Sequence, residues 1–242
     1  MNYHWNWGIF AQQVQAGEET YFDWLLSGLG WTVACSLSAW VIALALGTAI
    51  GVLRTTRSRT LSGAGAAWVE LFRNIPLLVQ MFLWFFVVPE LLPRELSLWV
   101  KQDMPAKEFV TATLCLGLFT SARIAEQVRA GIQSLPRGQR DAALALGLSS
   151  AQAYRHVLLP RALRVIMAPL TSEFMNTFKN SSVAYAIGLL ELTFRARQMQ
   201  EDSEQGIETY IAVTLLYFLC AFIANRVMAL IEARTRIPGS IG

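Results

Sequence analysis

The sequence predicts an all-α integral membrane protein with about five transmembrane helices. Two features of its composition support this class: hydrophobic residues make up 54% of the 242 positions, and charged residues only 15%. That balance is too apolar for an ordinary soluble domain of this length. Because a helix needs roughly 20 mostly apolar residues to cross the hydrocarbon core of a bilayer, we expect the long apolar stretches of the chain to be membrane spans.

The apolar stretches define the elements in order. The five expected spans cover residues 25–53, 75–92, 109–128, 162–178 and 210–231. Small residues such as Gly47 and Gly51 interrupt the first span, and they let neighbouring helices approach closely. The second span ends near Pro89 and Pro93. The amphipathic segment before it, residues 65–74, is expected to extend the same helix toward the membrane surface.

The basic residues orient these spans, because Lys and Arg are enriched in cytoplasmic loops. Arginines follow the first, third and fifth expected spans: Arg54, Arg57, Arg59 and Arg73; Arg129, Arg137, Arg140, Arg155, Arg161 and Arg164; and Arg234 and Arg236. The N-terminal tail has neither Lys nor Arg, and the segment that contains Glu201 and Glu208 is acidic. We therefore expect the N-terminus to lie outside, in the periplasm, and the C-terminus in the cytoplasm.

The sequence lacks the residues that several functional classes would need. The three cysteines lie far apart, within apolar stretches and without metal-ligand spacing, so we interpret them as small core residues. His4 and His156 are the only histidines, which leaves little material for a metal site or a catalytic triad. The basic residues are not clustered with stacking aromatics, as a nucleic-acid surface would require. We expect no catalytic residue, no metal, no cofactor bound by this chain and no nucleic-acid partner.

The segment at residues 134–160 is too charged to span a membrane, and its residue pattern is too regular for an irregular loop. Small apolar side chains recur among polar ones there, which favours short helices. Gly147 marks a break where the backbone either approaches another group closely or turns with positive φ. The segment has the pattern of a docking element. The alternative is a loop in which Gly and Pro merely end helices.

The spacing within this segment resembles the EAA loop of binding-protein-dependent ABC importer permeases. Asp141, Ala142 and Ala143 are followed, after three intervening residues, by Gly147 and, after nine more, by Val157-Leu158-Leu159-Pro160. Asp141 replaces the usual Glu, and Val157 the usual Ile. The resemblance implies the transmembrane domain of a type I ABC importer, with this loop as the coupling helix in a groove of the ATPase. The coupling residues would be Asp141, Ala142, Ala143, Gly147, Leu159 and Pro160.

Three further motifs, at residues 70–80, 125–139 and 178–192, resemble the subfamily that transports polar amino acids. The sequences at residues 6–10 and 87–93 are similar to those of glutamate/aspartate transporter permeases. The resemblance implies a multi-pass inner-membrane permease for polar amino acids, with glutamate and aspartate favoured. A permease for glutamine, a basic amino acid or an opine remains open. A channel or carrier outside the ABC class, or an integral membrane enzyme, fits the docking segment less well.

The expected partners follow from the same resemblance. This sequence contains no Gly-x4-Gly-Lys-Ser/Thr phosphate loop, so another polypeptide is expected to use ATP and Mg²⁺. The family implies a pair of ATPase subunits, a periplasmic amino-acid-binding protein and a second permease. Acidic amino acid systems of this type usually combine two different permeases, which favours a heterodimer over a homodimer.

Ionisable side chains at membrane depth are costly and usually paired or functional. Arg123, Glu126 and Arg129 are three residues apart and share a helix face. We expect Glu126 to pair with Arg129 or with Lys179 and to fix helix packing. Glu173 is expected to pair in the same way.

Arg123 differs, because the subfamily usually has an aromatic residue at this position. A guanidinium can hold a carboxylate through two parallel hydrogen bonds, so we hypothesise that Arg123 helps to select acidic amino acids. Further candidates for lining the substrate path lie near an expected helix break before Val183. The substrate-path residues are therefore Arg123, Glu126, Asn176, Lys179, Asn180 and Ser181.

Overall fold

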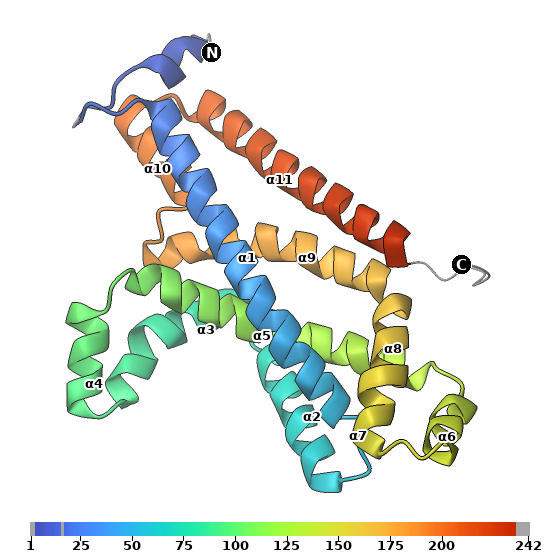
Figure 1. Ribbon diagram of the computed structural model, residues 1–242. Helices are drawn as coiled ribbons and strands as arrows, with labels where there is room; N and C mark the ends of the chain where they lie inside the picture. The colour runs from blue at the N-terminus through green and yellow to red at the C-terminus, as the bar shows by residue number, and fades with distance from the viewer. Residues whose placement is uncertain (1–2, 16, 236–242) are drawn as a thin grey trace. The chain divides into compact units, whose positions relative to one another are not determined.

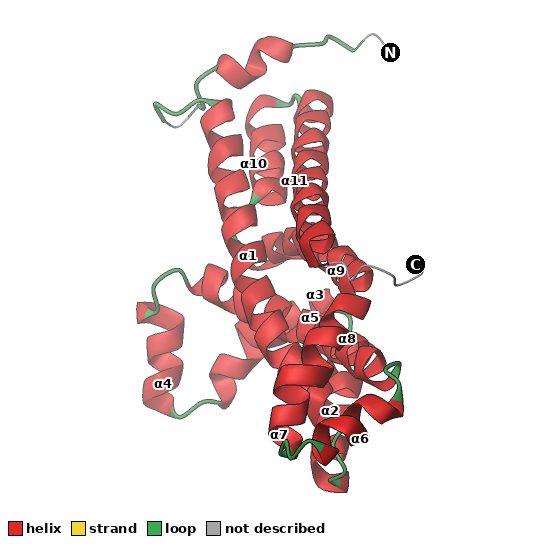
Figure 2. Cartoon of the chain, turned by 45° about the vertical axis from the view of Figure 1, so that its right-hand side comes forward, coloured by secondary structure: helices red, strands yellow, loops and turns green. Residues whose placement is uncertain are grey.

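The computed structural model describes residues 3–15 and 17–235, and helices dominate this part of the chain (Figures 1 and 2). In these two ranges the β-structure is limited to one isolated bridge between Gln13 and Thr20. The all-α class predicted from the composition is confirmed.

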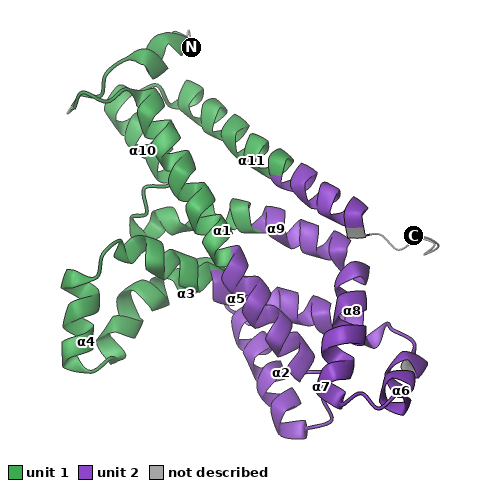
Figure 3. Cartoon of the chain, viewed as in Figure 1, with its two compact units in different colours: residues 1–39, 76–116, 177–223 green, residues 40–75, 117–176, 224–242 purple. Residues whose placement is uncertain are grey.

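The chain divides into two compact units, each built from three separate segments (Figure 3). Unit 1 comprises residues 1–39, 76–116 and 177–223, and unit 2 comprises residues 40–75, 117–176 and 224–242. Three long helices contribute residues to both units: α1 (Tyr21–Leu53), α5 (Lys107–Gln133) and α11 (Gly206–Thr235).

These three helices are also long and apolar enough to cross a membrane, judged by length and composition over the described residues. They overlap the spans expected at residues 25–53, 109–128 and 210–231. A fourth candidate appears if the broken pair formed by residues 59–74 and 77–91 counts as one span. The expected fourth span, residues 162–178, falls on two helices, α8 (Leu159–Val165) and α9 (Met167–Ser181), which meet at Ile166.

The expectation that residues 65–74 extend the helix of the second span is wrong. Helix α2 (Arg59–Asn74) ends before Ile75, whose φ of −101° and ψ of 129° are extended. The next helix, α3 (Leu77–Phe82), begins after Pro76. A proline disfavours helical backbone at the preceding residue and cannot donate a hydrogen bond to the preceding turn, so the chain breaks here.

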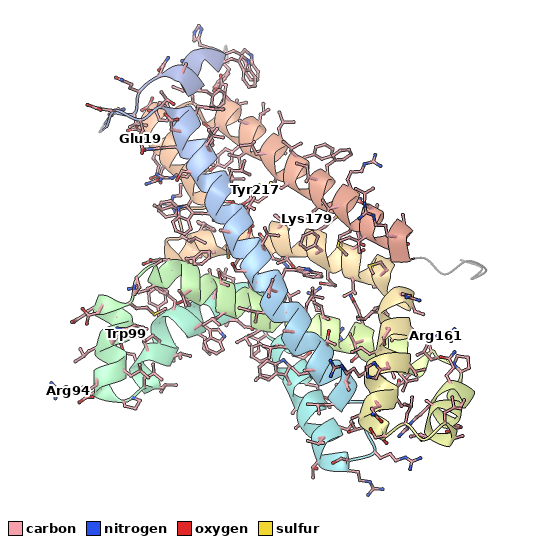
Figure 4. The ribbon with its side chains drawn as sticks, viewed as in Figure 1. Glu19, Arg94, Trp99, Arg161, Lys179 and Tyr217 are labelled. Atoms are coloured by element: carbon pink, nitrogen blue, oxygen red, sulfur yellow. The ribbon has the colours of Figure 1, made fainter. Side chains whose placement is uncertain are left out.

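The remaining elements of unit 1 are short helices around α1, α3 and α11. Their bounds are η1 (Trp7–Ala11), η2 (Leu83–Val87), η3 (Val88–Leu91), α4 (Arg94–Leu98), η4 (Trp99–Asp103), η6 (Ser182–Ile187) and α10 (Leu192–Ser203). The fully buried Glu191 caps α10 by accepting hydrogen bonds from the backbone N–H groups of Thr193 and Phe194. The Tyr217 hydroxyl (Figure 4) donates to the same carboxylate at 2.5 Å.

Unit 2 packs α1 against α5 through small residues. A Cβ atom added at Gly47 would lie 2.7 Å from the Ile124 Cβ and 2.8 Å from the Ser121 carbonyl oxygen. A Cβ at Gly51 would lie 2.7 Å from the Val128 Cβ. Only glycine permits this approach, so the predicted role of small residues in the first span is confirmed at both positions.

Candidate functional site

The segment expected to dock with a partner folds into a helix, a tight corner and a second, longer helical stretch, all in unit 2. Helix α6 (Arg137–Ala145) comes first. After the corner the chain is helical without interruption through α7 (Ser150–Ala153), η5 (Tyr154–Leu158) and α8. Both parts are helical, as the sequence pattern predicted.

Gly147 forms the corner. Its φ is +84°, in the left-handed region that glycine reaches at the lowest cost. The Gly147 N–H donates to the Leu144 carbonyl at 3.0 Å, and the Leu148 N–H donates to the Ala143 carbonyl at 3.2 Å. These two bonds form a Schellman motif, which satisfies carbonyls at the end of α6. Of the two roles proposed for Gly147, the turn is confirmed: apart from Gly147 and its two chain neighbours, no heavy atom of the described residues lies within 4 Å of an added Cβ.

The second helical stretch starts two residues later with a capping box. The Gln152 backbone N–H donates to the Ser149 hydroxyl at 3.3 Å, and the Ser149 N–H donates to the Gln152 side chain at 2.8 Å. Both helix ends at the corner are thus hydrogen-bonded within their own backbone and side chains. The corner is therefore defined locally, with Leu148 as the one residue between Gly147 and the cap.

Pro160 explains the widened turn in the second stretch. It is the second residue of α8 and has no N–H to donate to the preceding turn, where its ring also crowds the backbone carbonyl. The preceding five residues, η5, form a π-helical turn, with the Leu159 N–H bonded to the Tyr154 carbonyl. Leu159 is half-buried and Pro160 is exposed.

Helix α6 presents a largely uncovered surface. Asp141, Ala142 and Ala145 are exposed, while Ala143 is 4% exposed and faces the interior of unit 2. Leu146 is 84% exposed, the largest value among the exposed large hydrophobic residues of the described chain. An apolar side chain this bare at the tip of a structured corner is suited to a partner surface.

A second feature of unit 2 is a group of charged side chains on and around α5, which we call the polar cluster (Arg54, Arg73, Arg123, Glu126, Arg129 and Glu173). The Glu126 carboxylate accepts hydrogen bonds from Arg129, including one from Nε at 3.1 Å, so this predicted pairing is confirmed. Its other oxygen pairs with Arg54. Sequence reasoning placed Arg54 only in a basic loop. Arg54 directly follows an apolar span, and the long side chain of an arginine at such a position can extend along the helix end to a nearby carboxylate.

Arg123 lies on the same helix face as Glu126 but has different surroundings. Its Nη1 is 3.9 Å from Glu173 Oε1, and its guanidinium carbon is 4.9 Å from the centroid of the Phe119 ring. The Arg123 side chain is 42% exposed and that of Glu173 13%. The guanidinium thus has a distant ionic partner and an open side from which a ligand can reach it.

These side chains line a pocket of about 280 Å³ formed by Arg73, Arg123, Glu126, Gln127 and Glu173. The pocket contains two arginines, Arg73 and Arg123, and two carboxylates, of which Glu126 is already shared by Arg54 and Arg129. The buried Gln127 Oε1 has no hydrogen-bond partner within the described ranges. The pocket therefore offers guanidinium donors for carboxylates and oxygen acceptors for an ammonium group.

The remaining substrate-path candidates lie on α9, which ends at Ser181 close to the expected break. Asn176 belongs to unit 2 and is half-buried. Lys179 (Figure 4) is exposed, Asn180 is half-buried and Ser181 is buried, all in unit 1. The Ser181 hydroxyl donates to the Phe178 carbonyl at 2.7 Å, which satisfies it within its own helix. A role for these four residues in a substrate path stays a prediction.

Comparisons with known proteins agree with one another on the family of this chain. Residues 42–237 match the family described as "Binding-protein-dependent transport system inner membrane component". The chain is 50% identical over 244 residues to the glutamate/aspartate import permease protein GltJ of Escherichia coli K12, covering 100% of this chain and 99% of that protein. It is 34% identical over 198 residues to the probable glutamine ABC transporter permease protein GlnM of Bacillus subtilis, covering 82% and 87%.

Solved structures agree. The crystal structure of an amino acid ABC transporter with histidines contains a chain that is 28% identical, with a TM-score of 0.74, covering 88% of this chain and 95% of that one. A chain of the MetNI methionine ABC transporter is 21% identical with a TM-score of 0.68, covering 86% and 96%, and supports the fold alone.

Proposed function

Because this chain belongs to the family of binding-protein-dependent transport system inner membrane components, we propose that it imports acidic amino acids, glutamate and aspartate, across the inner membrane. The chain is a permease subunit of an ABC importer, with the fold of a type I importer transmembrane domain, and it is a transport component rather than an enzyme. The full-length identity of 50% to GltJ carries the substrate assignment.

The pocket of unit 2 supports this substrate class on chemical grounds. Glutamate and aspartate each carry two carboxylates and one ammonium group at neutral pH. Arg73 and Arg123 can donate paired hydrogen bonds to carboxylates, and the orphaned Gln127 oxygen can accept one from an ammonium group. Arg123 is the residue we assign to selecting the side-chain carboxylate, and Asn176, Lys179, Asn180 and Ser181 are further residues that we propose for the substrate path.

Coupling to ATP is assigned to the corner around Gly147. In this proposal the exposed surface of α6, with Asp141, Ala142 and Leu146, docks in a groove of an ATPase subunit that binds ATP and Mg²⁺. Ala143 packs inward and holds α6 on unit 2, while Leu159 and Pro160 shape the helix that follows. Closure of the ATPases would push α6, and the locally bonded corner would pass the displacement to the helix at residues 150–165 and so drive alternating access.

The proposed assembly contains two ATPase subunits, a periplasmic binding protein and a second, different permease. Escherichia coli O6:H1 has two proteins named glutamate/aspartate import permease, GltJ and GltK, which are 50% and 31% identical to this chain. Two distinct permeases of the same named function in one organism favour a heterodimer. We place the N-terminus in the periplasm and the C-terminus in the cytoplasm, from the distribution of arginines.

The test is substrate-stimulated ATP hydrolysis by the complex, purified with its ATPase and second permease and reconstituted with the binding protein. Glutamate and aspartate should stimulate hydrolysis severalfold, while glutamine and arginine should not. Stimulation by glutamine alone would replace the acidic substrate with a neutral one. Solute uptake by this chain alone in liposomes, without any ATPase, would overturn the assignment to an ATP-driven importer.

A further inference from the structure

A groove of about 510 Å³ lies in unit 2 beside the corner, separate from the pocket of the polar cluster. Three arginines, Arg57, Arg140 and Arg155, reach it from the loop after α1, from α6 and from η5. No aspartate or glutamate lines it. The proposed docking surface and substrate path make no use of these arginines.

The three arginines of the groove are outside the ion pairs of the described residues, and the carboxylate of Asp141 lines a neighbouring pocket together with Arg57 and Arg140. Arg140 lies near the Tyr154 ring, with 5.9 Å between its guanidinium carbon and the ring centroid, and Arg57 and Arg155 are exposed. Like charges that converge without a carboxylate repel one another, so an anion bound between them would be stabilised by all three.

The walls of the groove are apolar. They include Val52, in the last turn of α1, together with Ala151 and Leu159. Val52 belongs to a helix long and apolar enough to cross a membrane, so the apolar wall continues from a membrane span. A ligand that fits both parts needs an anionic group next to an apolar chain.

The two sides of the groove are tied together. The Tyr154 hydroxyl donates a hydrogen bond to the Thr55 carbonyl oxygen at 2.9 Å, which joins the loop after α1 to η5. Arg57 and Arg155 are therefore carried on backbone segments that this hydrogen bond links, which lowers the ordering cost of binding.

We propose that this groove binds the phosphate of an anionic phospholipid, such as phosphatidylglycerol, in the cytoplasmic leaflet. The phosphate lies among Arg57, Arg140 and Arg155, and the acyl chain lies along Val52 and Leu159. Basic pockets at the cytoplasmic ends of membrane helices recognise such headgroups. The leaflet follows from the orientation assigned above, whereas the choice of lipid follows from the charge and apolar walls of the groove. An acidic patch of the ATPase is the rival occupant.

Native mass spectrometry of the purified transport complex, titrated with phosphatidylglycerol or phosphatidylcholine, tests the proposal. Phosphatidylglycerol should bind in preference, and soluble glycerol 3-phosphate, which has no acyl chain, should not displace it. The triple variant Arg57→Gln, Arg140→Gln, Arg155→Gln should bind phosphatidylglycerol about a hundredfold more weakly.

The matched control replaces Arg59, Arg161 and Arg164 with Gln. These three arginines are exposed and do not line the groove, so replacing them removes the same charge without changing the groove. The control should bind phosphatidylglycerol like the wild type. A variant with lysine at positions 57, 140 and 155 keeps the charge, so it should retain most of the preference even if the glutamine variant fails to fold.

Two results would overturn the proposal. One is an equal loss of phosphatidylglycerol in the groove variant and the control, which would make the effect one of net charge. The other is loss of the ATPase subunit from the groove variant while lipid binding is unchanged, which would assign the groove to the ATPase interface. Both readouts are independent of substrate, so neither result bears on the acidic amino acid assignment.

Discussion

Arg54, one residue beyond the end of α1, forms an ion pair with Glu126 on α5 inside unit 2. Both side chains are largely covered, with exposed fractions of 16% and 28%. Glu126 also accepts from Arg129, so this carboxylate joins two cations. Because both oxygens of Glu126 pair with arginines of the same unit, we assign this carboxylate a structural role rather than a role in binding substrate.

Replacing Glu126 with Gln should therefore destabilise the chain. The change replaces the carboxylate with a neutral amide that has one acceptor oxygen, so two partly covered guanidinium groups lose their charged partner, at a cost of about 2 kcal/mol. For a chain of this size that lowers the midpoint of thermal unfolding by about 4 to 8 °C, measured in detergent. The control is Glu201→Gln, which breaks an exposed pair with Arg197 on α10 whose side chains are both 62% exposed. Equal shifts in the two variants would contradict the structural role.

Gly147 should tolerate replacement poorly. Alanine at a φ of +84° costs about 1 to 2 kcal/mol, which the corner would relieve by changing shape. We expect Gly147→Ala to retain less ATPase on co-purification and to lose coupled hydrolysis, and Gly147→Asn to lose less, because asparagine adopts this conformation more readily. Gly138→Ala, within α6 and free of close neighbours, is the matched control and should assemble normally. Full assembly and coupling in Gly147→Ala would remove the corner from the mechanism.

The contact between α1 and α5 should be sensitive to a single methyl group. Gly47→Ala places a Cβ 2.7 Å from that of Ile124, so the helices must separate at a cost of about 1 to 3 kcal/mol. Gly30→Ala, where no neighbour lies within 4 Å, should have no effect. The comparison is made by thermal unfolding of each variant in detergent. If Gly47→Ala were as stable as Gly30→Ala, the helices would not be in contact there.

Arg123 should govern discrimination between acidic and neutral substrates. Arg123→Tyr removes the charge-assisted hydrogen bonds to a side-chain carboxylate, so the preference for glutamate over glutamine should fall by about 10- to 100-fold. Arg123→Lys keeps the charge without the paired geometry and should lie between the two. The readout is competitive uptake in proteoliposomes, with Arg164→Gln as a control for charge alone. An unchanged preference in Arg123→Tyr would remove the residue from the selectivity assignment.

The orientation can be tested with reporter fusions. A reporter that is active only in the periplasm should work when it is fused near Asp103 and fail near Gly138, because the arginines place the second site in the cytoplasm. A reporter active only in the cytoplasm should show the opposite pattern. Activity of the periplasmic reporter near Gly138 would discard the proposed topology.

Local sequence signals predicted the local geometry well. The spacing of three residues predicted the pairing of Glu126 with Arg129, because such residues share a helix face. Gly147 was expected to turn or to approach another group, and the two hydrogen bonds that close its turn join residues at most five positions apart. The all-α class followed from composition, which is a property of the whole chain.

Contacts distant in sequence were not predicted. Arg54 and Glu126 are 72 positions apart, and their pairing depends on how α1 packs on α5. The break at Ile75 carried a local signal in Pro76, but the apolar pattern on both sides favoured one continuous helix. The pocket that joins Arg73 on α2 to Glu173 on α9 likewise depends on tertiary packing and has no signature in either segment.

The bare side chain of Leu146 has a consequence for biosynthesis. Full burial of a leucine side chain stabilises a protein by about 1.5 to 3 kcal/mol. A subunit made without its partner subunits lacks this stabilisation, and its Leu146 stays exposed to water. Orphan copies would then be prone to aggregation and open to quality-control proteases. Balanced synthesis of the subunits would keep this population small.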